Sequence, residues 1–399
     1  MKLTGINMND VKQSNRSAVL YLLNREGALS RKDIAQKLGL TPAAVTKICR
    51  ELLEEKKIIE IGKSDESIKA GRKKILISLN SDKLFAIAVS LELDYCNYGI
   101  YTVSGKTVLS ERVAFDRKEK PDTFLNRIST EINALIRKSK TARKNIIGVG
   151  VGIVGSVNSD GITVGKYGLW QEEVRVKEIF ERNLKLPVIA DNNIKAFVLA
   201  QTLFEKQAQG RNKLFIKWGP GVGSAIMIDS EVFSSNKSGE AEIGHYIVHP
   251  NGTPCRCGRK GCLETHISTG AIINRIKESY SKETTPLLFA LTNGKNENIN
   301  YELLAENREK LDKCILDIID RRINRMARAV VNAATLLDPD GVVVFGYMFD
   351  RYTTQRFIEY CKNYYPKYDE NFITVSTLFD KSQYIGAVAL VLKNMFFEM

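Results

Sequence analysis

The 399-residue sequence predicts an α/β protein that carries a small basic helical module at its N-terminus. Two observations predict this fold class. Residues 81–399 alternate apolar strand-like segments with amphipathic helical ones, which favours mixed sheets covered by helices. Residues 1–80 instead show three short helical periods, and they hold +7 of the net charge of +13. We therefore expect one domain over 1–80 and a body over 81–399, with an anionic partner such as nucleic acid for the first.

Composition excludes several protein classes. With 44% apolar and 26% charged residues and only nine prolines, the chain is neither collagen-like nor broadly disordered. The N-terminus lacks the apolar core of a signal peptide, and the stretch 385–392 is far shorter than the roughly 18 residues of a membrane span. We therefore expect a cytoplasmic protein without a membrane partner. Seven cysteines, three of them between 255 and 262, favour metal ligation over disulfides there.

The first eighty residues predict three helices. The first covers 11–25, and the second follows Ser30, whose hydroxyl and the carboxylate three residues later form an acidic capping box, and stops at Gly39. The third begins at Thr41, an N-cap followed by proline at the position that a helix tolerates, and ends near residue 55. Helix, glycine turn and helix is the spacing of a helix-turn-helix.

The polar face of the third helix is the candidate nucleic-acid interface. Its apolar face carries Val45, Ile48 and Leu52, which leaves small, hydroxyl and basic side chains for a major groove. Two strands near 58 and 75 with a basic tip between them complete a winged helix. A basic surface for solubility, or a winged helix that contacts protein, are the alternatives. The residues that we expect at DNA are Arg31, Thr41, Ala43, Ala44, Thr46, Lys47 and Arg50 in the helices and Arg72 and Lys73 in the wing.

The sequence of the body, residues 81–399, predicts an α/β fold and contains no repeat of 20–50 residues. Helices are expected at 123–136 and 315–337, and 280–310 is the most loop-like part. The expected strands are 85–91, 98–103, 146–153, 188–190, 214–218, 225–228 and 342–345.

A glycine-rich segment, Gly219-Pro220-Gly221-Val222-Gly223, lies between two of these strands. Such glycines let a backbone approach a phosphate closely, but a hairpin needed only for folding explains the same residues.

One histidine and three cysteines predict a metal site. His245, Cys255, Cys257 and Cys262 are the ligand set of a closed structural zinc site, and two glycines supply the turn that brings the sulfurs together. His249 is a competing imidazole, and buried free thiols are the alternative interpretation.

Polar side chains flank these ligands in the sequence. Asn192, Asn193, Glu242 and Glu264 offer two amides and two carboxylates, which suit several hydroxyls at once, as a sugar requires. A histidine bound to zinc through one nitrogen can present its other N–H to a ligand. An ordinary polar loop network is the alternative.

Taken together, these residues resemble the ROK family of sugar-responsive repressors and sugar kinases. The N-terminal LNREGALSRKDIAQKLGLTPAAVTKICREL is similar to the winged helix of the family's repressor branch, and EIGHYIVHPNGTPCRCGRKGCLE is similar to the family signature. The resemblance implies an actin-like, ribonuclease H-like body with two lobes, as in sugar kinases. It also implies that His245 and the three cysteines bind one structural zinc per chain, and that Glu242, His245 and Glu264 contact sugar hydroxyls.

The chain departs from the family where the kinases catalyse. The family's Asn-Asp pair, whose Asp is the catalytic base, falls on Asn192-Asn193, and an amide cannot accept the sugar's proton. The family's first phosphate motif falls on residues 90–94, where this chain has the acidic residues Glu92 and Asp94. The family's Gly-Thr-Gly is replaced by Gly-Pro-Gly at 219–221, and its Gly-Gly near the adenosine is replaced by Gly-Tyr at 346–347. We therefore expect no catalytic residue and no enzyme.

The resulting hypothesis is a sugar-responsive repressor of carbohydrate genes, such as those of xylose metabolism. Its partners are double-stranded operator DNA and a sugar or sugar phosphate. The resemblance and the two-fold symmetry of helix-turn-helix half-sites imply a homodimer or a dimer of dimers. The alternatives are a sugar kinase with an accessory DNA-binding domain and a regulator controlled by a partner protein.

Overall fold

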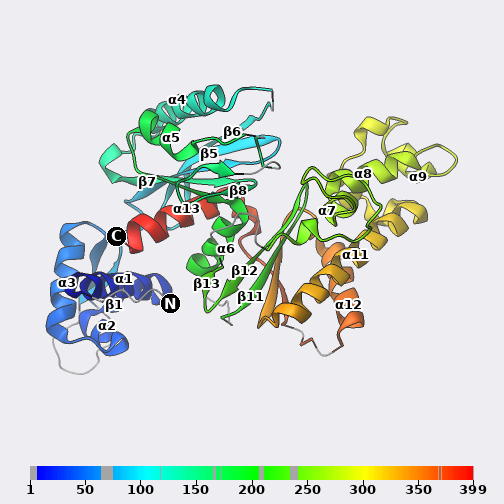
Figure 1. Ribbon diagram of the computed structural model, residues 1–399. Coiled ribbons are helices and arrows are strands. Elements are labelled where there is room, and N and C mark those ends of the chain that lie inside the picture. The colour runs from blue at the N-terminus through cyan, green and yellow to red at the C-terminus, as the bar shows by residue number, and fades with distance from the viewer. Residues whose placement is uncertain are drawn as a thin grey trace. The chain divides into compact units, whose positions relative to one another are not determined.

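The computed structural model describes residues 7–63, 75–116, 118–164, 168–170, 172–205, 211–233, 241–366, 368–369 and 371–398. Within it the chain forms two compact units (Figure 1). Unit 1 joins the first 207 residues to residues 383–399, and unit 2 comprises residues 208–382. The last residues of the chain therefore return to the unit that contains the first.

The N-terminal part of unit 1 is a winged helix-turn-helix. Ser30 and Asp33 form the expected capping box, Gly39 ends the second helix with φ 65°, and Thr41 caps the third helix ahead of Pro42. These predictions are confirmed. The elements are α1 (Met8–Glu26), β1 (Leu29–Ser30), α2 (Arg31–Leu38), α3 (Pro42–Glu54), β2 (Ile58–Lys63) and β3 (Ile75–Leu79), with the strands in the order β1-β3-β2.

Unit 1 also contains a five-stranded mixed sheet in the order β10-β7-β4-β5-β6. Helices α4 (Pro121–Ser139) and α5 (Val176–Leu184) place buried aromatic and aliphatic side chains on one face of it. The polar edge strand β6 is the one that the sequence did not predict, since most of its side chains are exposed. The strands are β4 (Phe85–Leu91), β5 (Tyr95–Thr102), β6 (Thr107–Ala114), β7 (Ile146–Ile153) and β10 (Val188–Asn192), and a separate ribbon pairs β8 (Ser156–Val157) with β9 (Thr163–Val164).

The opposite face of this sheet is covered by α6 (Asn193–Phe204) and by the C-terminal α13 (Ile385–Val391). A π-helical turn, Leu392–Phe397, continues α13. Strand β7 presents alternate glycines to this layer, and a Cβ on Gly150 would lie 1.8 Å from the carbonyl oxygen of Ala387. The close approach of helix to sheet therefore requires glycine at this position.

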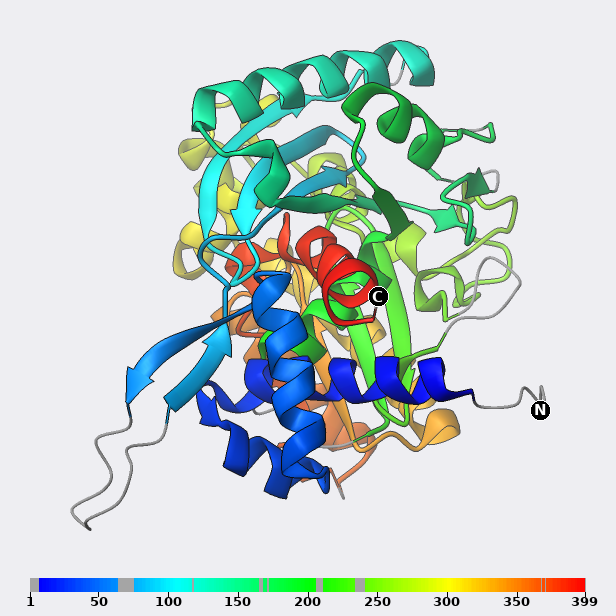
Figure 2. The ribbon, with the colours of Figure 1, turned by 90° about the vertical axis from the view of Figure 1, so that its left-hand side faces the viewer.

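The π-helical turn also contacts the winged helix (Figure 2). Ser17 donates a hydrogen bond to the carbonyl of Phe397 (2.6 Å), and the rings of Tyr21 and Phe397 stack at 4.4 Å. The ammonium of Lys57, a buried residue, donates to the carbonyl of Phe396 (2.8 Å), and burial lowers the pKa of Lys57. One C-terminal segment therefore touches both the DNA-binding module and the sheet.

Unit 2 repeats the strand arrangement of unit 1. Its sheet has the order β13-β12-β11-β14-β15, in which the first three strands are antiparallel and the last two run parallel to β11. Two such sheets, each covered by helices, confirm the expected sugar-kinase-like α/β body. The strands are β11 (Lys213–Trp218), β12 (Val222–Ile228), β13 (Glu231–Val232), β14 (Gly341–Phe345) and β15 (Ile373–Val375), and the long helices are α8 (Thr269–Glu278), α11 (Lys313–Leu337) and α12 (Arg351–Tyr364).

The segment 280–310 is helical in part, which corrects the expectation of a loop. It forms α9 (Pro286–Leu291) and α10 (Tyr301–Glu306). The carboxylate of Asp312 accepts hydrogen bonds from the backbone N–H groups of Leu287 and Leu288, and thereby caps α9 from a distance in sequence. Such a cap leaves no local signal in the sequence.

Candidate functional site

The face of α3 predicted to bind DNA is open. Ala43, Thr46, Lys47 and Arg50 are exposed, while Val45, Ile48, Cys49 and Leu52 on the other side are buried in the winged helix. Thr41 and Ala44 are engaged in the helix cap, where the Thr41 hydroxyl accepts from the Ala44 N–H (3.2 Å). The helix thus presents small, hydroxyl and basic groups outward, which is the surface that a major groove can admit.

The remaining residues predicted to bind DNA differ in what the structure shows. The guanidinium of Arg31 forms an ion pair with Glu60 on β2 (2.8 Å), so it holds the wing to α2. Arg72 and Lys73 lie outside the described residues. Glu51 of α3 and its C-cap Glu55 pair with Arg16 on α1, whereas Glu54 is exposed one turn after Arg50.

The four predicted metal ligands of unit 2 lie together. Their ligand atoms are all within 4.8 Å of one another, with Nδ1 of His245 3.6 Å from Sγ of Cys255 and Sγ of Cys257 3.6 Å from Sγ of Cys262. Zn–S bonds of about 2.3 Å in a tetrahedral site place sulfurs just under 4 Å apart, so this spacing fits zinc. His249, the competing imidazole, is exposed and is not in the cluster.

Burial shapes the acidity of this cluster. Burial and then the neighbouring thiols raise the pKa of Cys262 to about 12, and burial also raises that of Cys255. Backbone and side-chain hydrogen bonds outweigh burial at Cys257 and lower the pKa of that thiol. The bare thiols of Cys255 and Cys262 would therefore hold their protons at neutral pH, and a bound dication would displace them. The chemistry of the donor set thus suits a structural site, in which metal binding and local folding are linked.

The two predicted carboxylates of unit 2 flank the cluster. Nε2 of His245 faces away from the thiols and lies 3.9 Å from Oε2 of Glu242. When a metal occupies Nδ1, Nε2 carries the proton and can donate it in a hydrogen bond. Oε2 of Glu264 accepts from the N–H of Val222 (2.9 Å), and Oε1 lies 3.5 Å from Nε of Arg256.

The glycine-rich segment forms the turn between β11 and β12 and is tied to the helices after the cysteines. The N–H of Thr269 donates to the carbonyl of Gly219 (3.0 Å), and the indole of Trp218 donates to that of Ile267 (2.7 Å). Tyr347 packs beside the turn, since a Cβ on Gly219 would lie 3.4 Å from that of Tyr347. A role in folding thus accounts for the segment.

The two amides predicted to bind sugar lie in unit 1 at the start of α6. The side-chain oxygen of Asn192 accepts from the N–H groups of Ile194 and Lys195, and its nitrogen donates to the carbonyl of Gly155 (2.8 Å). Asn192 is therefore a helix cap. The amide nitrogen of Asn193 donates to Oε1 of Glu92 (2.8 Å).

The contact between Asn193 and Glu92 is a feature that sequence reasoning missed. Both residues depart from the family's kinase motifs, and the structure shows that the two departures form one hydrogen bond. An aspartate at 193 would face the Glu92 carboxylate, whereas an amide donates to it. The charge gained at 92 and the charge lost at 193 are thus coupled.

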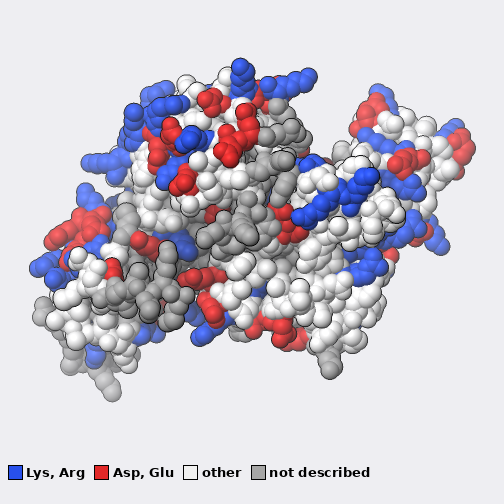
Figure 3. Space-filling view, viewed as in Figure 1, with Lys and Arg blue, Asp and Glu red and all other residues white. Residues whose placement is uncertain are grey.

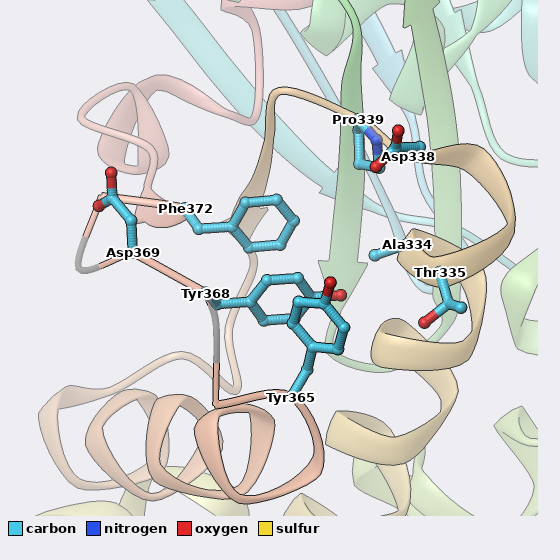
Figure 4. A pocket seen from close by; sticks show the side chains of 8 residues that line it. All are labelled: Ala334, Thr335, Asp338, Pro339, Tyr365, Tyr368, Asp369 and Phe372. Atoms are coloured by element: carbon cyan, nitrogen blue, oxygen red, sulfur yellow. The ribbon is translucent and has the colours of Figure 1, made fainter.

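A cavity of about 300 Å³ lies elsewhere in unit 2, among none of the predicted site residues (Figure 4). It lies between the end of α11 and the segment before β15. Along one side the ring of Tyr368 stacks on that of Phe372 and is tilted against that of Tyr365. Its aromatic wall is packed on itself, so we assign it no role.

Comparison with known proteins decides the family. The ROK family profile matches residues 86–394, which is most of the chain, and a winged helix-turn-helix DNA-binding profile matches residues 14–59. The chain belongs to the ROK family. Among the helices of this ROK protein that the structure describes, none is both long and apolar enough to traverse a lipid bilayer.

Relatives that match nearly the whole of this chain include proteins named as repressors. A putative xylose repressor of Caldicellulosiruptor sp. (strain Rt8B.4) is 25% identical over 96% of this chain and 97% of its own, and the N-acetylglucosamine repressor of Escherichia coli O157:H7 is 26% identical over 98% and 95%. The expectation of a DNA-binding regulator in place of an enzyme is confirmed.

Solved structures share the same fold. A ROK family transcriptional regulator, a homologue of the E. coli MLC protein, superimposes with a TM-score of 0.77 at 22% identity over 97% of both chains. A ROK glucokinase from Streptomyces griseus, solved with glucose and AMPPNP, gives 0.66 at 22% identity and covers 78% of this chain and all of its own.

Proposed function

We propose that this ROK protein is a cytoplasmic, sugar-responsive repressor of carbohydrate uptake and catabolism genes. The α3 face binds operator DNA as part of a homodimer. The body binds a sugar or sugar phosphate through Glu242, His245 and Glu264. The xylose and N-acetylglucosamine named for the relatives indicate the class of ligand.

The hydrogen bond between Asn193 and Glu92 supports a regulatory role over a kinase activity. Residue 193, where a sugar kinase would need a general base, is an asparagine, and its amide nitrogen already donates a hydrogen bond to the carboxylate of Glu92. Replacing Asn193 by Asp would place two carboxylates about 3 Å apart, where the repulsion between their charges favours a shared proton over a free base. ATP-dependent phosphorylation of a sugar is therefore not expected from the unchanged protein or from Asn193→Asp.

The test combines DNA and sugar binding. Fluorescence anisotropy on the protein's own promoter region should show a salt-dependent complex, and Lys47→Ala should weaken it about tenfold, the loss expected for one or two charge-assisted contacts. Lys144→Ala removes the same charge from an exposed site in the body and is the matched control. Equal affinities for the two variants would contradict the assignment of the α3 face.

The effector is identified by a thermal-shift screen of pentoses, hexoses, amino sugars and their phosphates, because a bound ligand stabilises the native state. The sugar found in this screen should also change operator affinity in the anisotropy assay. The size of that change is set by how much more tightly the sugar binds one form of the protein than the other. Glu242→Gln should abolish this response and leave DNA binding intact. A sugar-insensitive complex would instead support control by a partner protein.

We also propose one structural zinc per chain, held by His245, Cys255, Cys257 and Cys262. Protein purified without chelators should contain about one zinc by elemental analysis, and Cys257→Ser should lose most of it together with the sugar response, since three ligands do not close the site. Cys314→Ser, which changes an exposed cysteine outside the cluster, is the control. Zinc-free protein with a full sugar response would refute the site.

A further inference from the structure

Two basic side chains of α1 hold the carboxylate of Glu51 on α3. Nζ of Lys12 lies 3.0 Å from Oε1 of Glu51, and Nη1 of Arg16 lies 2.8 Å from Oε2. Both oxygens of this carboxylate are therefore engaged from the side of α1. Nη2 of the same guanidinium lies 2.6 Å from Oε1 of Glu55, the C-cap residue of α3.

Arg16 is the more confined of the two cations. Its side chain is 12% exposed, whereas that of Lys12 is 50% exposed and that of Glu51 is 19% exposed. A guanidinium is a planar fork, and one that engages two carboxylates through its two terminal nitrogens fixes their positions more firmly than an exposed ammonium does. The hydrogen bond from Lys12 lowers the pKa of Glu51 and that from Arg16 adds to the effect, so this carboxylate is charged at neutral pH.

Glu51 lies next to the open face of α3. It follows Lys47 by four residues, which places it about 40° from Lys47 around the helix axis, and side chains at this spacing are neighbours on a helix surface. An unheld Glu51 would therefore pair with Lys47 and bring a negative charge toward the operator phosphates. In the structure Lys47 is exposed, and none of the carboxylates in the described ranges pairs with it.

A second carboxylate of α3 provides a comparison. Figure 3 shows Asp and Glu side chains among Lys and Arg side chains over the winged helix. Glu54 is exposed, and no cation within the described part of the chain forms an ion pair with it. Glu51 and Glu54 each follow a basic residue of the open face by four positions, but only Glu51 is held by α1.

We propose that Arg16 and Lys12 are positioning residues for DNA binding, which hold Glu51 away from Lys47 and from the operator. They act through Glu51, and contact between them and DNA is not required. This inference rests on the proposed role of the α3 face. It differs from a role in folding alone, because the two cations then matter to DNA affinity only while residue 51 is acidic.

Fluorescence anisotropy on the promoter region at several salt concentrations tests the inference. Arg16→Met keeps an apolar stem and should weaken the complex about threefold, and Lys12→Met/Arg16→Met should weaken it about tenfold, the loss expected when one charge-assisted contact is neutralised. The slope of log affinity against log salt should fall by up to about one, because a Lys47 paired within its own helix releases fewer counterions. Adding Glu51→Gln to the double variant should restore both the affinity and the slope.

Glu54→Gln is the matched control, since it removes the same charge from α3 one turn after Arg50. Its effect on affinity should be equal in the unchanged protein and in Lys12→Met/Arg16→Met. The gain from Glu51→Gln should instead be about tenfold larger in the double variant than in the unchanged protein, because only there is the carboxylate released.

The outcomes separate this inference from the proposed function. If Lys12→Met/Arg16→Met binds the operator as tightly as the unchanged protein, the inference is wrong. It is also wrong if Glu51→Gln does not restore the affinity, because a loss caused by misfolding of the winged helix would persist in that variant. If Lys47→Ala leaves the affinity unchanged, the role of the α3 face is wrong and the inference fails with it.

Discussion

Gly150→Ala should destabilise unit 1 by at least about 3 kcal/mol, the upper range for overpacking a core, since the atom in the way belongs to backbone. A Cβ there would lie 1.8 Å from the carbonyl oxygen of Ala387 and 2.7 Å from its carbonyl carbon. Neither β7 nor α13 can shift alone, because both are paired or packed on further elements. Denaturant unfolding followed by circular dichroism measures the loss.

Gly152→Ala is the matched control, two residues along the same strand and on the same face. Its Cβ would lie 3.6 Å from Cα of Asn193, which is ordinary contact. We expect a change in stability of no more than about 1 kcal/mol. If both variants were equally stable, the packing of α13 on the sheet would be wrong.

Gly261→Ala should abolish zinc binding and lower the melting temperature of the protein. Gly261 has φ +67°, and an added Cβ would lie 1.6 Å from the carbonyl oxygen of His249. The loop would have to open at the residue next to Cys262, which separates one thiolate from the other three ligands. Elemental analysis after gel filtration and a thermal melt check both effects.

Gly258→Ala provides the comparison within the same loop. Gly258 also has a positive φ, +87°, but nothing lies within 4 Å of the added Cβ. We expect only the backbone cost of a left-handed alanine, about 1 kcal/mol, with zinc retained. Loss of zinc from both variants would mean that backbone conformation, and not the contact with His249, governs the loop.

The sequence predicts best those features that neighbouring residues determine. The caps at Ser30 and Thr41 and the turn at Gly39 are local, and the structure contains all three. The cluster of metal ligands could also be predicted from the sequence, because three of its four residues lie within eight positions of the chain. Hydrogen bonds and loop geometry over a few residues determine these features, so the types and spacing of those residues are sufficient to predict them.

Features that depend on distant residues were not predicted. Glu92 and Asn193 are 101 positions apart, so the sequence showed two lost motifs but not that they compensate each other. Asp312 caps α9 across 24 and 25 positions. Tertiary packing decides such contacts, and a single sequence carries no signal for them.

The return of α13 to unit 1 has a consequence for synthesis on the ribosome. The glycine-bearing face of β7 is complete once residue 153 has emerged, but α13, which covers part of it, follows only after the whole of unit 2, about 230 residues later. At roughly 5–20 residues per second this interval lasts about 12 to 46 s. During that time the nascent sheet has one incompletely covered apolar face, and Phe396 and Phe397 have not yet reached the winged helix. In a newly made chain the winged helix therefore meets Phe396 and Phe397 only after the whole of unit 2 has been synthesised.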